Sequence, residues 1–365
     1  MDATLADGVV RAGESARERF YDSRGYGRPV DGGRLELAPV EAAHLLYRSD
    51  LAAVDGQSFR TFLTSAAVSE TAFLVYKDLR DRGFYLSPAR DAWVADGVDL
   101  GADDSPGDRA AGEPPDNTGT GVDFVVYPRG SGPWDGEVAY RVAVVGERVP
   151  VAAADLGDAV LAVVDEESEI TYLETDRPEI AGTNEVALPE SVPAELLDER
   201  VFVWDPPTRL YESGFYGQRL DDQAGDVLQL SLVEAAYLVE QGALAVTGGA
   251  GAVRERGRAA EGDRFDRRLH AYTALRERGI VPKTGFKFGA DFRTYAHVES
   301  VENLGHSELL VRVLDADHSF APRDLALDVR LAHGVRKEMT FALVESGEGD
   351  DGGDVEWVSV GRLTP

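Results

Sequence analysis

Apolar residues in the second half of the chain recur with the spacing of amphipathic helices. One such face consists of Leu232, Ala235, Ala236 and Val239. Ser231 and Glu234 form a capping box at its start, and Gly242 follows its end. A second face consists of Phe265, Leu269, Tyr272 and Leu275 and precedes Gly279. We therefore expect one helix on each face, each ended by a glycine.

After Gly279 the pattern becomes typical of strands. The strand-like segments are FKFGADFRTYAHV, SELLVRVL, MTFALVES and DVEWVSV. A further helix is expected from about Pro322, between the second and third of these segments. The pattern thus predicts a helical part followed by a mixed sheet with one or two helices.

The same order of segments occurs earlier in the chain, which indicates a tandem repeat. Four pairs match in sequence: RFYDSRGYGRPV with RLYESGFYGQRL, LELAPVEAAHLL with LQLSLVEAAYLV, LRDRGFYLSPA with LRERGIVPKTG, and VDFVVYPRG with ADFRTYAHV. In the first copy Pro39 takes the first position of a predicted helix and Glu41 the third. The insert DGVDLGADDSPGDRAAGEPPDNTGTG shortens the offset of the last pair.

The repeat predicts a mixed α/β (α+β) fold built by tandem duplication. Each copy is a small helical α/β N-subdomain followed by a mixed-sheet C-subdomain. We expect subdomains at 1–85 and 86–175 in the first copy and at 201–280 and 281–365 in the second. The acidic, proline-rich segment 176–200 is the expected linker.

The amino-acid composition indicates the class of protein and the chemistry that it excludes. Among 365 residues, 37 are basic and 66 acidic, a net charge of −29, and 43% are apolar. The chain has no cysteine, which excludes disulfides, thiol catalysis and cysteine-ligated metals. The four lysines are Lys77, Lys283, Lys287 and Lys337. This acidic, lysine-poor composition is similar to that of cytoplasmic proteins of extreme halophiles, and no membrane span is expected. A protein that binds cations or basic partners is the alternative.

Two stretches of the second copy carry a more specific pattern, KTGFKFGADFRTYAHVESVENLGHSELLVRV and DVRLAHGVRKEMTFALV. They resemble the catalytic region of archaeal tRNA-splicing endonucleases, from about Leu275 to Val344, and a weaker resemblance continues through the first copy. The likeness is to the fused two-repeat form of that family. It implies a restriction-endonuclease-like C-subdomain, a homodimer with two active sites, and a cytoplasmic enzyme without cofactor or metal.

The resemblance assigns three catalytic groups. Tyr295 would accept the proton of the attacking 2′-hydroxyl, His306 would protonate the departing 5′-oxygen, and Lys337 would stabilise the charge on phosphorus. A histidine titrates near neutrality and suits the acid role, and lysine supplies a compact positive charge. The expected products are a 2′,3′-cyclic phosphate and a 5′-hydroxyl.

The first copy looks catalytically inactive. Tyr127 matches the tyrosine, but the loop PRGSGPWDGEVAYRV after it contains no histidine, and Asp158 stands about where the lysine is expected. The second copy therefore carries the expected active site.

The resemblance also implies that the protein binds precursor tRNA at a bulge–helix–bulge motif. Arg330 lies seven residues before Lys337, two helical turns, which predicts one shared face, and Trp357 would be the second plane around a bulged base. Core packing is the alternative for Trp357. Further cations expected near the cut are Lys283, Lys287, Arg293 and Arg336. An acidic segment, either Asp165 to Glu174 or the linker, is the candidate for a dimer contact.

Two other functions remain open from the residues. The chain could be a non-catalytic RNA-binding subunit that depends on another polypeptide for cleavage. It could also be a metal-dependent nuclease of the restriction-enzyme type, for which Asp291 is the acid nearest to a suitable strand.

Overall fold

The structure is a computed structural model that describes residues 2–90, 93–94, 121–220, 226–345 and 354–365. It divides into two compact units. The first comprises Met1–Asp176 with Ser319–Leu327 and Gly361–Pro365, and the second Arg177–His318 with Asp328–Val360. Both the segment expected as an insert in the first copy and the segment GEGDDGG before the last strand lie outside the described residues, except Gly121.

The first unit begins with a five-stranded sheet in the order β3-β4-β2-β1-β5. These strands are β1 (Asp2–Ala6), β2 (Val9–Ala12), β3 (Arg28–Pro29), β4 (Leu35–Leu37) and β5 (Ala53–Val54). The helices are η1 (Arg17–Asp22, π), η2 (Asp31–Gly33, 3-10), α1 (Pro39–Tyr47), α2 (Phe59–Leu63) and α3 (Glu70–Asp81). As expected, Pro39 opens α1 and Glu41 accepts from the Ala38 amide at its start.

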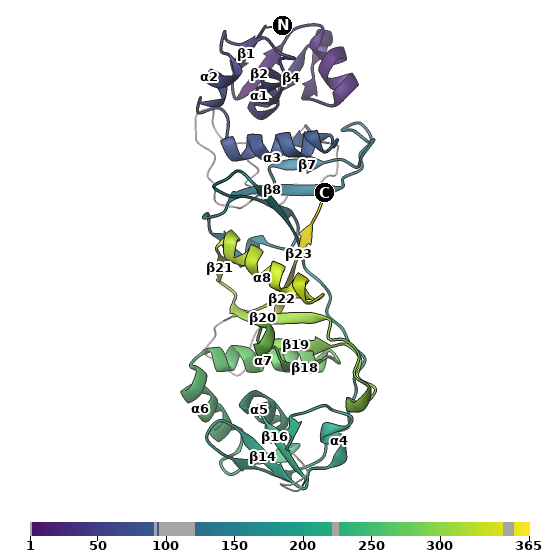
Figure 1. The fold of residues 1–365 in the computed structure, drawn as a ribbon, viewed down its shortest axis with the longest axis vertical. Helices are drawn as coiled ribbons and strands as arrows, with labels where there is room; N and C mark the ends of the chain where they lie inside the picture. The colour runs from purple at the N-terminus through teal and green to yellow at the C-terminus, as the bar shows by residue number, and fades with distance from the viewer. Residues whose placement is uncertain (1, 91–92, 95–120, 221–225, 346–353) are drawn as a thin grey trace. The chain divides into compact units, whose positions relative to one another are not determined.

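A second sheet of this unit runs β11-β10-β8-β7-β6. Its strands are β6 (Leu86–Pro88), β7 (Phe124–Val126), β8 (Tyr140–Gly146), β10 (Val160–Val164) and β11 (Ile170–Asp176). Between β8 and β10 come β9 (Val151–Ala152) and the 3-10 turn η4 (Ala153–Asp155). The helix α3 covers this sheet (Figure 1), and its Tyr76 ring packs edge-on against Phe124.

The second unit repeats the plan. Its N-terminal strands are β12 (Val192–Pro193), β13 (Glu195–Leu196), β14 (Val201–Trp204), β15 (Gln218–Arg219), β16 (Val227–Leu230) and β17 (Leu244–Ala245). The helices are α4 (Thr208–Tyr211), α5 (Leu232–Glu240), α6 (Gly249–Glu261) and α7 (Arg264–Glu277). The capping box of Ser231 and Glu234 at α5 and the buried face of α7 are both confirmed.

The C-terminal sheet of this unit runs β18-β19-β20-β22-β23. Its strands are β18 (Val281–Thr284), β19 (Phe292–Tyr295), β20 (Leu309–Asp315), β22 (Glu338–Val344) and β23 (Glu356–Leu363). The remaining elements of this unit are η5 (Phe286–Phe288) and η6 (Val301–Asn303). The strand β21 (Ser319–Phe320) belongs to the first unit, and α8 (Pro322–Gly334) is divided between the units after Leu327. The helix α7 packs on this sheet and contacts β18, β20 and β22 (Figure 1).

Strand pairing in the two sheets follows the same sequence of directions. From β6 to β11 the pairs are antiparallel, antiparallel, parallel and antiparallel, and the pairs from β18 to β23 repeat this order. Phe124 pairs with Val142, and Phe292 pairs with Val311. Since Tyr127 and Tyr295 each stand three residues after these phenylalanines, the register fixes which residues of the two copies correspond. The tandem duplication is therefore a property of the fold as well as of the sequence.

The expected linker is more ordered than its composition indicates. Val192, Ala194 and Leu196 pack against the core of the second unit, and β12 and β13 pair with β17 and β14. The alternation of apolar residues at these positions is a strand signal inside an acidic, proline-rich segment. The prediction of a linker as far as residue 200 was therefore wrong in its last part. Within the described ranges, no helix combines the length and apolar character needed to cross a bilayer.

Candidate active site

Sheet topology brings the three expected catalytic residues to one edge of the second unit. Tyr295 is the last residue of β19, His306 stands three residues before β20, and Lys337 directly precedes β22. Because β19 is antiparallel to β20 and β20 is parallel to β22, the end of β19 and the starts of the other two strands share an edge. Hydrogen bonds confirm this closeness, since the Glu308 amide donates to the Thr294 carbonyl and the Glu338 amide to the Glu308 carbonyl.

Tyr295 has a packed ring and an available hydroxyl. It is 6% exposed, and its ring meets Phe215 edge-on with centroids 5.9 Å apart. The Arg293 guanidinium lies 5.8 Å from the centre of the same ring. Among the described residues, none forms a hydrogen bond with the Tyr295 hydroxyl, and this oxygen is not among the buried atoms that lack a partner, so it is available to a substrate.

Lys337 is anchored beside the histidine. Its Nζ donates to both the carbonyl and the Oγ of Ser307, the neighbour of His306, and lies 5.8 Å from the Phe288 ring centre. Partial burial, together with the positive charge of Arg293, lowers the pKa of the Lys337 ammonium below its ordinary value. His306 itself is exposed, and its imidazole forms no hydrogen bond with another described residue.

Arg293 is a cation without a counter-charge in the described part of the chain. It is half-buried in β19, no ion pair with a described carboxylate involves it, and its Nε is buried without an acceptor. A buried guanidinium nitrogen of this kind is unfavourable unless an anion satisfies it. Together with Lys337 it gives this edge of the sheet a local positive charge within a strongly acidic chain.

Strand register gives the first-copy counterparts of these residues. Val160 pairs with Val142, and Thr340 pairs with Val311, so Val160 corresponds to Thr340. Three residues earlier, the counterpart of Lys337 is Gly157, with φ of 121°. The prediction of Asp158 at this position was wrong by one residue, because the alignment of this segment had no strand pairing to fix it. The functional consequence is the same, since the first copy has no lysine there.

The tyrosine of the first copy is engaged in a hydrogen bond. Tyr127 is fully buried, and its hydroxyl donates to the Ser87 Oγ over 3.0 Å. The residue that corresponds to Arg293 is Val125, and the residue three before β8 is Glu137 instead of a histidine.

Two expectations about the surrounding cations need correction. Arg330 is exposed on α8, but the helix ends at Gly334, and Arg336 has a positive φ of 58°. Lys337 therefore lies in the turn after the helix, and the prediction of a helical face shared with Arg330 was wrong. Arg336 and Lys287 are exposed near the same edge.

Lys283 was expected near the cut but is a buried residue. Its Nζ donates to Glu234 Oε1 over 3.0 Å and to the carbonyls of Phe215 and Gly217 over 3.1 and 2.7 Å. These three acceptors use all three ammonium hydrogens, so Lys283 is not available to RNA.

Trp357 packs in the core of the second unit. It is 6% exposed in β23 and pairs with Ala342, and Arg278 lies 6.0 Å from its ring. By register its counterpart in the first copy is Tyr172, which is equally buried and lies 5.7 Å from Arg82. Because the first copy, which lacks the expected histidine and lysine, keeps this aromatic–arginine pair, the structure favours the core-packing alternative.

The acid considered for a metal-dependent nuclease is already neutralised. Asp291 is 7% exposed and binds Arg264 and Arg268 at 2.5 and 3.0 Å, and it accepts from the Val313 amide. In the first copy Asp123 accepts from the Val144 amide in the same way. The carboxylate therefore fixes the sheet in both copies.

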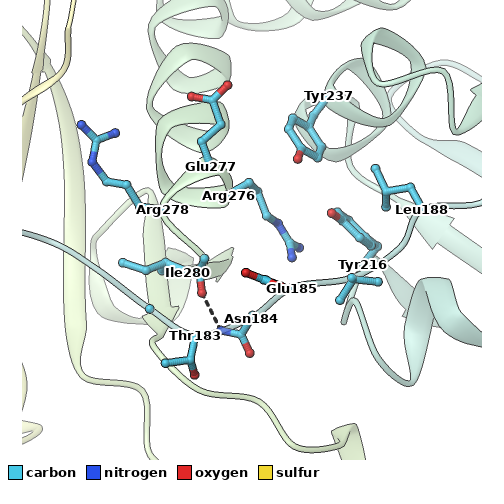
Figure 2. Close-up of a pocket in the computed structure, with 13 residues that line it drawn as sticks. Thr183, Asn184, Glu185, Leu188, Tyr216, Tyr237, Arg276, Glu277, Arg278 and Ile280 are labelled. Atoms are coloured by element: carbon cyan, nitrogen blue, oxygen red, sulfur yellow. Dashed lines mark hydrogen bonds between the residues drawn. The ribbon is translucent and has the colours of Figure 1, made fainter.

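A cavity of about 470 Å³ in the second unit lies apart from these residues (Figure 2). Its lining includes Asn184, Tyr216, Tyr237 and Arg276, and none of the three candidate catalytic residues. Asn184 links the cavity wall to the site, because its Nδ2 donates to the Gly279 and Ala296 carbonyls and its Oδ1 accepts from the Val298 amide. These hydrogen bonds of the Asn184 side chain hold the loop that follows Tyr295.

Comparisons with known proteins agree with the duplicated fold. The family described as tRNA intron endonuclease, catalytic C-terminal domain, matches residues 265–357. The family described as tRNA intron endonuclease, N-terminal domain, matches twice, at 1–63 and 192–255. The chain is 64% identical to the tRNA-splicing endonuclease of Haloarcula marismortui and 60% identical to that of Natronomonas pharaonis, with both chains covered completely. It is 35% identical to the tRNA-splicing endonuclease of Methanococcoides burtonii over all of this chain and 99% of that one.

The catalytic-domain match over the sheet that carries the site defines an endoribonuclease. The chain belongs to the tRNA-splicing endonuclease family.

Sequence reasoning missed three residues of this region, Ser307, Phe215 and Asn184. The sequence contained a signal for one of them, since the aligned segments RFYDSRGYG and RLYESGFYG place Phe215 opposite Gly25. Contacts of Ser307 and Asn184 depend on chain segments that are far apart in sequence, so no local pattern reports them.

Proposed function

We propose that the chain cleaves precursor tRNA at bulge–helix–bulge splice sites by attack of the 2′-hydroxyl, with Tyr295, His306 and Lys337 as the catalytic residues. The observation that carries this proposal is the meeting of these residues at one edge of β19, β20 and β22, compared with the first copy. There the lysine position holds Gly157, and the Tyr127 hydroxyl is bound to Ser87. The first copy thus has a structural role.

The proposed reaction forms one bond and breaks one. The 2′-oxygen attacks phosphorus while Tyr295 takes its proton, and the bond to the 5′-oxygen breaks as His306 supplies a proton. Lys337 and Arg293 stabilise the additional negative charge on the phosphoryl oxygens. The products are a 2′,3′-cyclic phosphate and a 5′-hydroxyl, and no metal takes part.

RNA would be held by exposed cations and by shape. Arg330, Arg336 and Lys287 are exposed, so they can reach the backbone or stack on a splayed base. In concentrated salt, counter-ion release contributes little to affinity, and a few local cations are compatible with a net charge of −29.

A homodimer follows from the substrate. Two splice sites flank an intron, and a chain with one complete site needs a second copy to present two. In molar potassium chloride we expect a species of twice 39.4 kDa in solution. We further propose that the enzyme works in the cytoplasm, where precursor tRNA is processed.

The test is cleavage of a bulge–helix–bulge RNA in molar potassium chloride with EDTA. We expect wild type to cut both bulges and leave cyclic phosphates, and Lys337→Ala to be slower by about 10²–10³-fold. Lys77→Ala is the matched control, because Lys77 lies on α3 of the first unit in an ion pair with Asp81. Full activity of Lys337→Ala, or cleavage that requires magnesium, would refute the site. Tight binding without cleavage under any ionic condition would support the subunit alternative.

A further inference from the structure

The ring of Tyr295 rests on a residue with an unusual backbone. Phe215 has a φ of 48°, in the left-handed region, although it is neither glycine nor asparagine. A bulky residue is unfavourable in this conformation and persists there only where the surrounding contacts hold it. Phe215 is 4% exposed, and its ring contacts Tyr295 edge-on.

The turn has a left-handed φ in both copies, since the counterpart Gly25 has a φ of 64°. In the second copy Lys283 holds the phenylalanine in this conformation. Its Nζ binds the carbonyls on both sides of Tyr216, those of Phe215 and Gly217, and lies 4.7 Å from the Phe215 ring centre. Glu234 completes the arrangement, because its Oε1 accepts from both Lys283 and the Gly217 amide. A buried ion pair with every hydrogen-bonding group satisfied is rigid, so the loop that carries Phe215 has one geometry.

Lys283 and Tyr295 lie on the same face of the sheet. Val281 pairs with Tyr295 and Lys283 pairs with Arg293 across β18 and β19, and alternate residues of a strand point to the same side. Phe215, Val281 and Tyr295 form a common apolar cluster. Lys283 is therefore coupled to the tyrosine through Phe215 and through the strand pair.

The first copy lacks the lysine and the phenylalanine of this arrangement but keeps the glutamate and its hydrogen bond to the turn. Glu41 corresponds to Glu234 and accepts from the Gly27 amide in the same way. Lys283 is replaced by Ser87, and Phe215 by Gly25. A side chain at Gly25 would meet Pro133 and Tyr85 at 3.1 and 3.2 Å, so the larger Tyr85, which replaces Val281, occupies the space of the phenylalanine.

We propose that Phe215, held by Lys283 and Glu234, is a positioning residue that sets the place of the Tyr295 ring for proton transfer. The inference rests on the proposed role of Tyr295. We call the contacts from Glu234 through Lys283 and Phe215 to Tyr295 the brace. The first copy lacks the brace, whereas the glutamate that caps the helix start is present in both copies, as Glu41 and Glu234. The contacts of Phe215 with Lys283 and Tyr295 thus occur only in the copy that carries the candidate catalytic residues.

The test is a double-mutant cycle in which kcat and KM are measured for cleavage of the splice-site RNA. Phe215→Gly introduces the residue found in the first copy and relieves the positive φ, so we expect it to fold. We expect kcat to fall roughly ten- to a hundred-fold with KM within about two-fold, because a displaced base slows chemistry without weakening binding. Phe215→Tyr, which keeps the ring, should restore at least a third of the rate. Ser87→Ala in the first copy is the matched control and should not change kcat.

The second arm uses Tyr295→Phe as background. If Phe215 acts through the tyrosine hydroxyl, Phe215→Gly causes no further loss in this background. A multiplicative loss, an unchanged kcat of Phe215→Gly, or a change confined to KM would overturn the positioning role. Full activity of Tyr295→Phe alone would instead refute the proposed function, so the two failures are distinguishable.

Discussion

The hydroxyl of Tyr127 donates a hydrogen bond to Ser87, whereas the corresponding Tyr295 hydroxyl has no protein partner among the described residues. Tyr295 is the last residue of β19, Tyr127 directly follows the equivalent strand β7, and both are buried. The same residue type is therefore used for structure in one copy and is available for chemistry in the other.

This difference predicts opposite results for the same substitution. Tyr295→Phe should lower single-turnover cleavage about 10²–10⁴-fold, the usual contribution of a positioned proton acceptor. Tyr127→Phe should leave the rate unchanged and lower the free energy of unfolding by about 1 kcal/mol through loss of the bond to Ser87. Equal loss of cleavage in both variants would mean that the first copy takes part in catalysis.

The environment of Lys337 predicts how cleavage depends on pH. Partial burial and Arg293 lower the pKa of its ammonium, so the positive charge is lost at a lower pH than that of an ordinary lysine. The rate should therefore fall on the alkaline side. Lys337→Arg keeps the charge at all accessible pH values, and its profile should lack that fall although its maximum is lower. A fall of the same size in both enzymes would assign it to another group.

The capping glutamates of the two copies should respond to pH in opposite directions. Burial raises the pKa of Glu41 to about 7, in spite of hydrogen bonds from the Ala38 and Gly27 amides. Because the folded pKa exceeds the unfolded value, the associated stability is complete below about pH 4.5 and is lost as pH rises through 7, about 3 kcal/mol in all. Thermal unfolding in molar salt should thus show the first unit weakening from pH 5 to 8. Glu41→Gln, a neutral isostere, should remove most of this dependence.

Glu234 differs because Lys283 is present. Although burial alone would raise it, the ammonium and the Gly217 and Ser231 amides lower the pKa of Glu234 to about 2. Its contribution is present above about pH 4.5 and is lost as pH falls through 2, so the second unit should lose stability in acid. Amide hydrogen exchange, which reports each unit separately, checks both directions. A second unit that weakens between pH 5 and 8 as the first does would contradict the charged pair.

Substitutions of Arg330 and of Trp357 should have different effects on RNA affinity. Arg330 is exposed, so Arg330→Ala should weaken binding by about 1–3 kcal/mol if it stacks on a base. Trp357→Phe should bind RNA as wild type does, because the indole is in the core, and Trp357→Ala should lower the free energy of unfolding by about 3–5 kcal/mol. Weaker binding by a fully folded Trp357→Phe protein would restore the sandwich with Arg330. Arg323→Ala, an exposed arginine at the start of the same helix, is the control.

The sequence by itself determined the elements and their duplication. The capping box at Ser231, the proline at Pro39 and the helical face of α7 depend on residues close together in the chain, whose preferences act locally. The motifs around Tyr295, His306 and Lys337 likewise identified the copy that carries the site.

Only the tertiary structure decided which residues meet. The register between β10 and β8 made Gly157 the counterpart of Lys337 in the first copy. The end of α8 at Gly334 showed that Lys337 does not share a helical face with Arg330. The burial of Lys283 and Trp357 excluded both from the candidate RNA-binding residues. Pairing, burial and the end of a helix depend on contacts between segments far apart in sequence, and local patterns do not contain them. The brace from Glu234 through Lys283 and Phe215 to Tyr295 joins four segments of the second copy, and for that reason it became visible only in the folded chain.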